Sequence, residues 1–211
     1  MVSFHFEQDR LRYLIGRSAL RTLIGGLSGI AASDVKFEYG AYGKPQLATK
    51  GRSCLQFNLS HSADVVLIAL ARGRAVGIDV EHIRGNVAII SIAARYFSAN
   101  EYKTLVHLDP AIQCSAFFKC WTRKEAYLKA RGDGLRVPLD RFEVAFAPEA
   151  APRLTANLDD PAEVARWDLR ELDLGENYAA ALAVEGTDWK LKCWDWPEAA
   201  GGQPMFASPA S

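Results

Sequence analysis

The sequence lacks any imbalance of charge, since 25 Lys and Arg residues stand against 25 Asp and Glu residues in 211. A chain without net charge has no overall field to attract nucleic acid or an anionic membrane, so electrostatic recognition must come from local clusters. No apolar run approaches the roughly 20 residues of a membrane span, and residues 1–7 lack the pattern of a signal sequence. We therefore expect a cytoplasmic protein that binds neither nucleic acid nor membrane.

Paired cysteines are also missing. Cys54, Cys114, Cys120 and Cys193 form no C-x-x-C motif, and none lies near a histidine at zinc-finger spacing. We expect all four to be reduced thiols. The hydrophobic share of 49% allows a sizeable core, in one large domain or two small ones.

What the sequence does contain is a pair of acids in the strand-like run GIDVE at 77–81. Side chains of a strand alternate between faces, so Asp79 and Glu81 lie on one face, roughly 6 to 7 Å apart. Both could reach one divalent cation, which would remove their mutual repulsion. A polar strand face in water is the alternative, and the pair alone leaves both interpretations open.

A second group of polar residues lies in the run WTRKEAYLK at 121–129. Trp121, Glu125 and Lys129 are spaced by four, so they share one face of a helix. If that face meets the acidic strand, Glu125 adds a third carboxylate; an all-oxygen donor set suits magnesium, which often shares its shell with phosphates. The alternative is an exposed ion pair between Glu125 and Lys129, worth a few tenths of a kcal/mol.

Two further runs are candidates for binding anions. FNLSHS at 57–62 places Asn, Ser and His side chains where a strand ends. The GKP run at 43–45 is not a phosphate loop, because no Ser or Thr follows the lysine and Pro45 has no N–H to donate. It is a tight turn that presents Lys44, and an inconsequential surface turn is the alternative.

Periodicity predicts an α+β fold with the helix and strand segments in two similar lobes, joined near residues 82–87. A hairpin is expected from the strands at 65–71 and 76–81 around the loop 72–74. We expect lobes at 1–84 and 85–196 and a disordered tail at 197–211, rich in Gly, Pro, Ala and Ser. Helices are expected at 9–27, 87–95 and 110–130, and another is expected to begin at a capping box of Ser98 and Glu101. Gly25 and Gly26 are expected to loosen the end of the first helix. The other strands are expected at 35–39, 142–146, 167–172, 178–184 and 189–194.

Five short blocks occur in order along the chain: GKP at 43–45, FNLSHS at 57–62, GIDVE at 77–81, FSANE at 97–101 and WTRKEAYLK at 121–129. Together they resemble the 4'-phosphopantetheinyl transferase superfamily, Sfp type, over roughly residues 9–195. The resemblance implies transfer of the phosphopantetheine arm of coenzyme A to a serine of a carrier protein, with release of adenosine 3',5'-bisphosphate. It also implies a pseudodimer of two lobes, each a helix on a small, mainly antiparallel sheet, with the active site in the cleft between them.

The resemblance assigns roles to individual residues. Asp79, Glu81 and Glu125 would hold Mg²⁺, Glu125 or a metal-bound water would take the serine proton, and Lys129 would steady the phosphate and the leaving group. The residues expected to bind coenzyme A are Arg12, Tyr42, Gly43, Lys44, Pro45, Ser60, His61 and Lys129. Family members carry a longer segment before the first helix, so either the true start lies upstream or the first lobe lacks an initial part.

The carrier protein is left open among those of fatty-acid, polyketide and nonribosomal-peptide biosynthesis, and we expect a monomer. A non-catalytic module that binds coenzyme A or a carrier protein is the alternative from another class. Three repelling carboxylates disfavour it, because a binding protein gains little from keeping them together. A magnesium-dependent phosphohydrolase is a third possibility.

Overall fold

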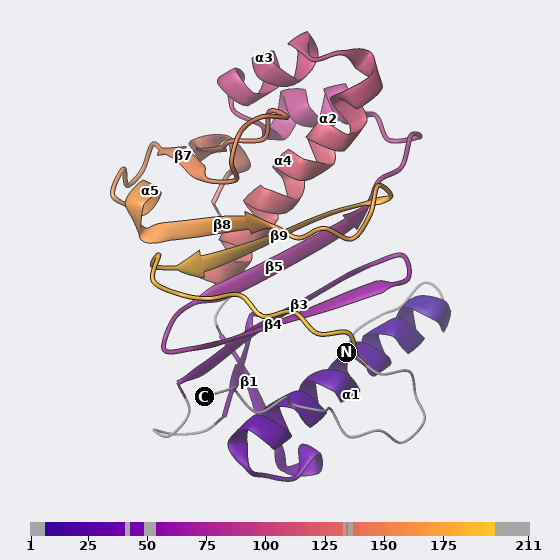
Figure 1. The fold of residues 1–211 in the computed structure, drawn as a ribbon, viewed down its shortest axis with the longest axis vertical. Helices are drawn as coiled ribbons and strands as arrows, with labels where there is room; N and C mark the ends of the chain where they lie inside the picture. Colours follow the sequence, from indigo (N-terminus) through magenta and orange to yellow (C-terminus); the bar gives the residue numbers. More distant parts are fainter. Residues whose placement is uncertain (1–6, 41–42, 49–53, 133, 135–136, 197–211) are drawn as a thin grey trace.

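The computed structural model describes residues 7–40, 43–48, 54–132, 134 and 137–196. Within them the chain is α+β, with helices packed against small antiparallel sheets (Figure 1). The helices are α1 (Glu7–Ser28), α2 (Ile89–Tyr96), α3 (Ala99–His107), α4 (Pro110–Arg131) and α5 (Glu163–Arg166). The strands are β1 (Phe37–Tyr39), β2 (Pro45–Leu47), β3 (Leu55–Ser62), β4 (Val65–Arg72), β5 (Val76–His82), β6 (Phe142–Val144), β7 (Leu154–Asn157), β8 (Trp167–Glu171) and β9 (Tyr178–Glu185).

The largest sheet has the order β5-β9-β8, and α4 packs on one of its faces (Figure 1). Small residues allow a close approach, because β9 has the sequence YAAALAVE and its four alanines are buried. Gly77 of β5 leaves no room for a side chain: a Cβ there would lie 2.1 Å from the carbonyl oxygen of Ala126. The contact places the acidic face of β5 directly against α4.

A second layer is formed by the hairpin of β3 and β4, which packs between α1 and the large sheet (Figure 1). On one side, Phe57 joins a buried cluster with Leu20 and Ile24 of α1. On the other side, Ala69 of β4 packs against Ile78 of β5 in a separate buried cluster. Strand β4 of the hairpin therefore packs against the face of β5 opposite α4.

Helix α4 is fixed at its ends and along its length. Asp109 caps its start by accepting a hydrogen bond from the Ala111 N–H (2.9 Å), and Gly132 ends it with φ of +80°, a conformation that favours glycine. Lys124 is fully buried and pairs with Glu101 (2.8 Å). Since a buried charge is costly without its partners, this contact sets which face of α4 turns to the core. The predicted capping box of Ser98 and Glu101 is confirmed at the start of α3.

The predicted hairpin of the strands at 65–71 and 76–81 is wrong. β4 pairs with β3, and β5 pairs with β9. The loop 72–74 instead carries the chain from one layer to the next, so β4 and β5 face each other through apolar side chains. Alternating apolar residues fit either arrangement, because the same side chains can line one sheet or join two stacked sheets.

Three other expectations need correction. Residues 189–194 form no strand, and the strand expected at 35–39 covers only Phe37–Tyr39. Gly25 and Gly26 do not loosen the first helix, which continues to Ser28. Strands β2 and β7 were not expected. The tail at 197–211 lies outside the described residues.

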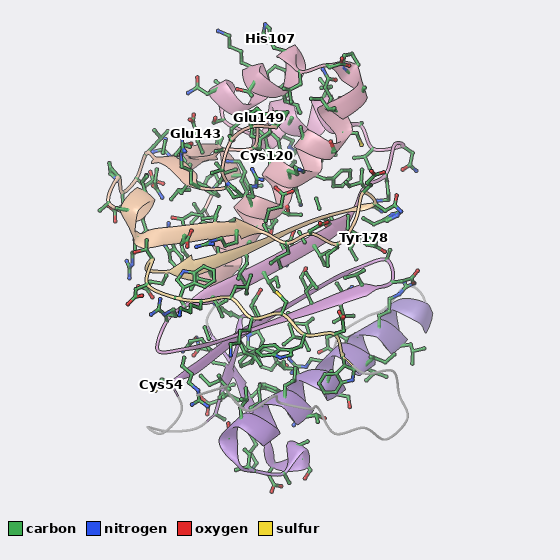
Figure 2. The ribbon with its side chains drawn as sticks, viewed as in Figure 1. Cys54, His107, Cys120, Glu143, Glu149 and Tyr178 are labelled. Carbon is green, nitrogen blue, oxygen red and sulfur yellow. The ribbon has the colours of Figure 1, made fainter. Side chains whose placement is uncertain are left out.

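The four cysteines are free thiols, as expected, and Figure 2 shows Cys54 and Cys120 in different layers. Among the described helices, none combines the length and the apolar character needed to cross a membrane.

We predict that Gly77→Ala destabilises the protein by about 3 kcal/mol or more, because the added methyl group would meet the backbone of α4, which cannot yield as a side chain could. Urea unfolding measures this loss. Gly85→Ala is the control, since a Cβ at Gly85 meets nothing within 4 Å, and it should leave the free energy of unfolding within about 0.5 kcal/mol of the wild type. Equal effects of the two substitutions would contradict the close approach described above.

Candidate active site

A cavity of about 480 Å³ lies where β3, β5, α1 and α4 meet. It combines an apolar wall, formed by two aromatic residues and a leucine, with a polar floor. Its lining is Tyr13, Leu59, Ser60, His61, Asp79, Glu81, Trp121, Glu125 and Lys129. The structure thus brings together the acidic strand and the predicted stripe of α4, which lie some forty residues apart in the sequence.

Asp79 is buried at the floor of this cavity. Its Oδ1 accepts hydrogen bonds from the Lys129 ammonium (2.6 Å) and the Ser60 hydroxyl (2.9 Å). Its Oδ2 is buried and has no hydrogen-bond partner among the described residues. Burial raises the pKa of the Asp79 carboxyl, and the positive charge of Lys129 opposes that rise.

Glu81 lies two residues further along β5, on the same face. Its Oε2 accepts a hydrogen bond from the Ser62 hydroxyl (3.0 Å), and the exposed Arg84 guanidinium lies 3.9 Å from the same oxygen. Burial raises the pKa of the Glu81 carboxyl, and the nearby charge of Asp79 raises it further. The two acids are therefore close enough to repel each other.

The stripe of α4 supplies the opposite wall. Burial raises the pKa of the Glu125 carboxyl, and so does the charge of Asp79, whereas Lys129 lowers it. Lys129 pairs with Asp79, and within the described part of the chain the alternative interpretation, an exposed ion pair of Glu125 and Lys129, is not observed. Trp121 stacks on Phe117 with ring centroids 5.9 Å apart, which fixes the aromatic wall.

The donor set fits a hard cation. The three acids that line the cavity offer only oxygen atoms, which is the chemistry that magnesium prefers. The unpartnered Oδ2 of Asp79 is a buried oxygen that a cation would satisfy. Among the described residues, however, no three His, Cys, Asp or Glu side chains stand in an arrangement that already encloses a metal ion.

A second cavity, of about 340 Å³, adjoins the first and shares Glu125 and Lys129 with it. Its other lining residues are Gly43, Lys44, Pro45, Asn58, Leu128, Gly132 and Gly134. The Lys44 ammonium donates to the carbonyls of Ala130 (2.9 Å) and Val76 (3.3 Å), and burial lowers the pKa of Lys44 to about 8. This lysine has carbonyl partners but no carboxylate among the described residues, so it could accept an anion.

The predicted coenzyme A residues are thus divided among several places. Ser60 and His61 line the first cavity, Gly43, Lys44 and Pro45 line the second, and Lys129 lines both. Arg12 pairs with Asp64 (2.9 Å) and is not among the lining residues of either cavity. Tyr42 lies outside the described residues.

Sequence reasoning missed some residues of the site. Tyr13 and Leu59 form part of the apolar wall. No motif marked Tyr13, and Leu59 lies within the FNLSHS run without having been assigned a role. Ser62 and Asn58 were seen only as members of a polar run, although their spacing on a strand carried a signal. Asn58, Ser60 and Ser62 alternate with Phe57, Leu59 and His61, so the polar side chains share one face.

Comparison with known proteins identifies relatives over most of the chain. The family model described as the 4'-phosphopantetheinyl transferase superfamily matches residues 75–183, and the model described as 4'-phosphopantetheinyl transferase, N-terminal, matches residues 1–72. The 4'-phosphopantetheinyl transferase HetI of Nostoc sp. is 40% identical over 194 residues, covering 92% of this chain and 78% of HetI. The 4'-phosphopantetheinyl transferase Sfp of Bacillus subtilis is 31% identical over 180 residues, covering 85% of this chain and 77% of Sfp.

We predict that Glu125→Gln stabilises the metal-free protein by about 0.5 to 1 kcal/mol at neutral pH, allowing for solvent screening at this half-buried position. The folded protein holds a proton on Glu125 more tightly than the unfolded chain does. The free energy of unfolding of the wild type therefore falls as the pH rises from the pKa of Glu125 in the unfolded chain to its higher pKa in the folded protein. The gain should therefore disappear in acid, where Glu125 is also neutral. Thermal unfolding measures the gain, and Glu149→Gln on the exposed surface should show none.

Lys44 gives a prediction at alkaline pH. Its pKa of about 8 lies below the unfolded value of 10.5, so between these values the unfolded chain binds more protons. Stability due to Lys44 should therefore rise from about pH 8 to about pH 10.5. Urea unfolding of the wild type and of Lys44→Met across this range measures the effect. The free energy of unfolding of the wild type should rise relative to that of Lys44→Met as the pH increases. A difference that does not vary with pH would contradict the lowered pKa.

Proposed function

This chain belongs to the 4'-phosphopantetheinyl transferase superfamily, Sfp type, and we propose that the two adjoining cavities together transfer the phosphopantetheine arm of coenzyme A to a carrier protein. The acceptor is the hydroxyl of a carrier serine. The observation that carries this proposal is the meeting of Asp79, Glu81, Glu125 and Lys129 in one cavity, with one buried carboxylate oxygen left without a partner.

The length of coenzyme A suits two connected cavities. Lys44 in the second cavity would attract the phosphates of the nucleotide half, and the apolar wall of Tyr13, Leu59 and Trp121 in the first would contact the pantetheine arm. The pyrophosphate would then lie beside Glu125 and Lys129, which line both cavities. His61, exposed at the end of β3, would approach a phosphate from the opposite side.

In the proposed reaction the carrier serine oxygen forms a bond to the phosphorus that bears the pantetheine arm. The bond from that phosphorus to the bridging oxygen breaks, and adenosine 3',5'-bisphosphate leaves. Glu125 would take the serine proton, as the family resemblance implies, since it lines the cavity beside Asp79 and Lys129. Lys129 would stabilise the charge that develops on the leaving group.

Asp79, Glu81 and Glu125 would hold magnesium, and Lys129 would keep Asp79 in place. The bound cation would neutralise pyrophosphate charge and so favour the transition state over the ground state. The raised pKa values of the three acids support this assignment, since a group of carboxylates kept at such a cost is typical of a functional site.

We also infer a two-lobed architecture with the site in the cleft between the lobes. The lobes proposed from the sequence are 1–84 and 85–196, and the gap between the two family matches, at residues 73 and 74, supports a division in this part of the chain. The pairing of β5 with β9 favours a boundary just before β5. One chain lines both cavities, which supports a monomer; the location is proposed to be cytoplasmic.

The transferase is tested by incubating a purified apo carrier protein with this protein, coenzyme A and Mg²⁺. We expect the carrier to gain the mass of one phosphopantetheine and an equal amount of adenosine 3',5'-bisphosphate to appear. Chelation of the metal should stop the reaction. Asp79→Ala should slow it by at least about a hundredfold, because cation binding contributes several kcal/mol to such reactions.

Glu149→Ala is the matched control, since this exposed acid lies at the helical end of the molecule, away from the large sheet (Figure 2). It should react like the wild type. No mass gain on fatty-acid, polyketide or peptidyl carriers, with folded protein, would leave a binding module as the better account. Release of adenosine bisphosphate without any carrier would indicate a phosphohydrolase instead.

A further inference from the structure

Strands β3 and β5 lie side by side without sharing the backbone pairing of a sheet. Three side chains of β3 instead accept hydrogen bonds from backbone N–H groups of β5. Asn58 accepts from Ile78 (2.9 Å), Ser60 from Val80 (3.3 Å) and Ser62 from His82 (3.0 Å). Each partner lies twenty positions further along the chain, so the two strands run parallel, and we call this row of bonds the β3–β5 seam.

Two members of the seam have a second role. The hydroxyl of Ser60 donates to Oδ1 of Asp79 (2.9 Å), and the hydroxyl of Ser62 donates to Oε2 of Glu81 (3.0 Å). The direction is fixed, because a backbone N–H can only donate and the single proton of a hydroxyl is then left for the carboxylate. Asn58 belongs to the same row but contacts neither acid.

The seam therefore occupies one oxygen of each acid. Within the described residues, Oδ2 of Asp79 and Oε1 of Glu81 have no hydrogen-bond partner. A carboxylate held by one oxygen presents the other in a fixed direction, which is what a cation ligand requires.

Glu81 depends on its serine more than Asp79 does. Asp79 is also held by Lys129, and it is almost wholly buried. The side chain of Glu81 is 29% exposed, and its other neighbour is Arg84 at 3.9 Å, whose side chain is 55% exposed. Without the hydroxyl of Ser62, Glu81 would be free to turn toward Arg84 and solvent.

We propose that Ser62 is a positioning residue that holds Glu81 in the orientation in which it binds the catalytic cation. The inference rests on the proposed function, because it assumes that Glu81 is a ligand. It adds a residue to the site that does not itself contact the cation. The seam thereby couples the packing of the β3–β4 hairpin to the geometry of the acids.

The test measures cation binding directly, with Mn²⁺ as the probe and the loss of its free electron paramagnetic resonance signal as the readout, with and without coenzyme A. Ser62→Ala should weaken Mn²⁺ binding about tenfold, as is typical when a partner of a metal ligand is removed. Ser62→Thr keeps the hydroxyl and should restore binding to within about threefold of the wild type. In the transferase reaction, Ser62→Ala should raise the Mg²⁺ concentration for half-maximal rate by the same factor and change kcat little.

Asn157→Ala is the control, since Asn157 likewise accepts hydrogen bonds from backbone N–H groups, those of Asp159 and Asp160 (3.0 Å each), and lines neither cavity. It should lower the thermal midpoint of unfolding yet bind Mn²⁺ like the wild type. Unchanged binding by Ser62→Ala would overturn the inference and leave the transferase proposal intact. Equal weakening in Ser62→Ala and Asn157→Ala, without rescue by Ser62→Thr, would also overturn it, because lost stability alone would then account for the weaker binding.

A wild type that binds no Mn²⁺ in either condition would overturn the inference together with the proposed metal ligands. The carrier assay would then show independently whether transfer occurs. If Asp79→Ala binds Mn²⁺ as tightly as the wild type does, the cation lies elsewhere and Ser62 has no role in its binding. Circular dichroism of each variant establishes that it is folded before binding is measured.

Discussion

The site depends on the close contact between α4 and the strand β5. Gly77 and the alanines of β9 bring the helix backbone against the sheet, and on that contact the acids of β5 meet Glu125 and Lys129. The buried pair of Lys124 and Glu101 fixes the rotation of the helix, so Lys124 turns to the core while its neighbour Glu125 turns to the cavity. A helix turned by a fraction of a turn would leave both charges of this pair buried without a partner, which is costly.

The electrostatics of the cavity are unbalanced in the absence of a ligand. Burial raises the pKa values of all three acids, and repulsion by neighbouring acids raises those of Glu81 and Glu125 further. Lys129 pairs with Asp79, and the exposed Arg84 lies 3.9 Å from Glu81. Such a site lowers the stability of the empty protein and gains free energy when positive charge enters. Stability and function are therefore in opposition at these positions, as is common where a protein prepares charged groups for chemistry.

Much of the local structure could be predicted from the sequence because its causes are local. The capping box of Ser98 and Glu101, the cap at Asp109 and the stop at Gly132 involve neighbouring residues, and the alternation of β5 placed Asp79 and Glu81 on one face. The pairing of strands could not be predicted, because the apolar pattern of β4 and β5 fits stacking as well as pairing. The role of Ser62 required knowledge of which strand lies beside β5, and no property of residues 57–62 contains that information.

The family resemblance named most of the charged residues that line the cavities but not their division between two cavities. Glu125 and Lys129 line both, so a molecule bound in one cavity changes the electrostatic environment felt in the other. Binding events that share charged groups are thermodynamically linked, and the linkage is reciprocal: whatever affinity a nucleotide adds for a cation, the cation adds for the nucleotide. The order in which the two enter then affects the rates of assembly but leaves the stability of the assembled complex unchanged.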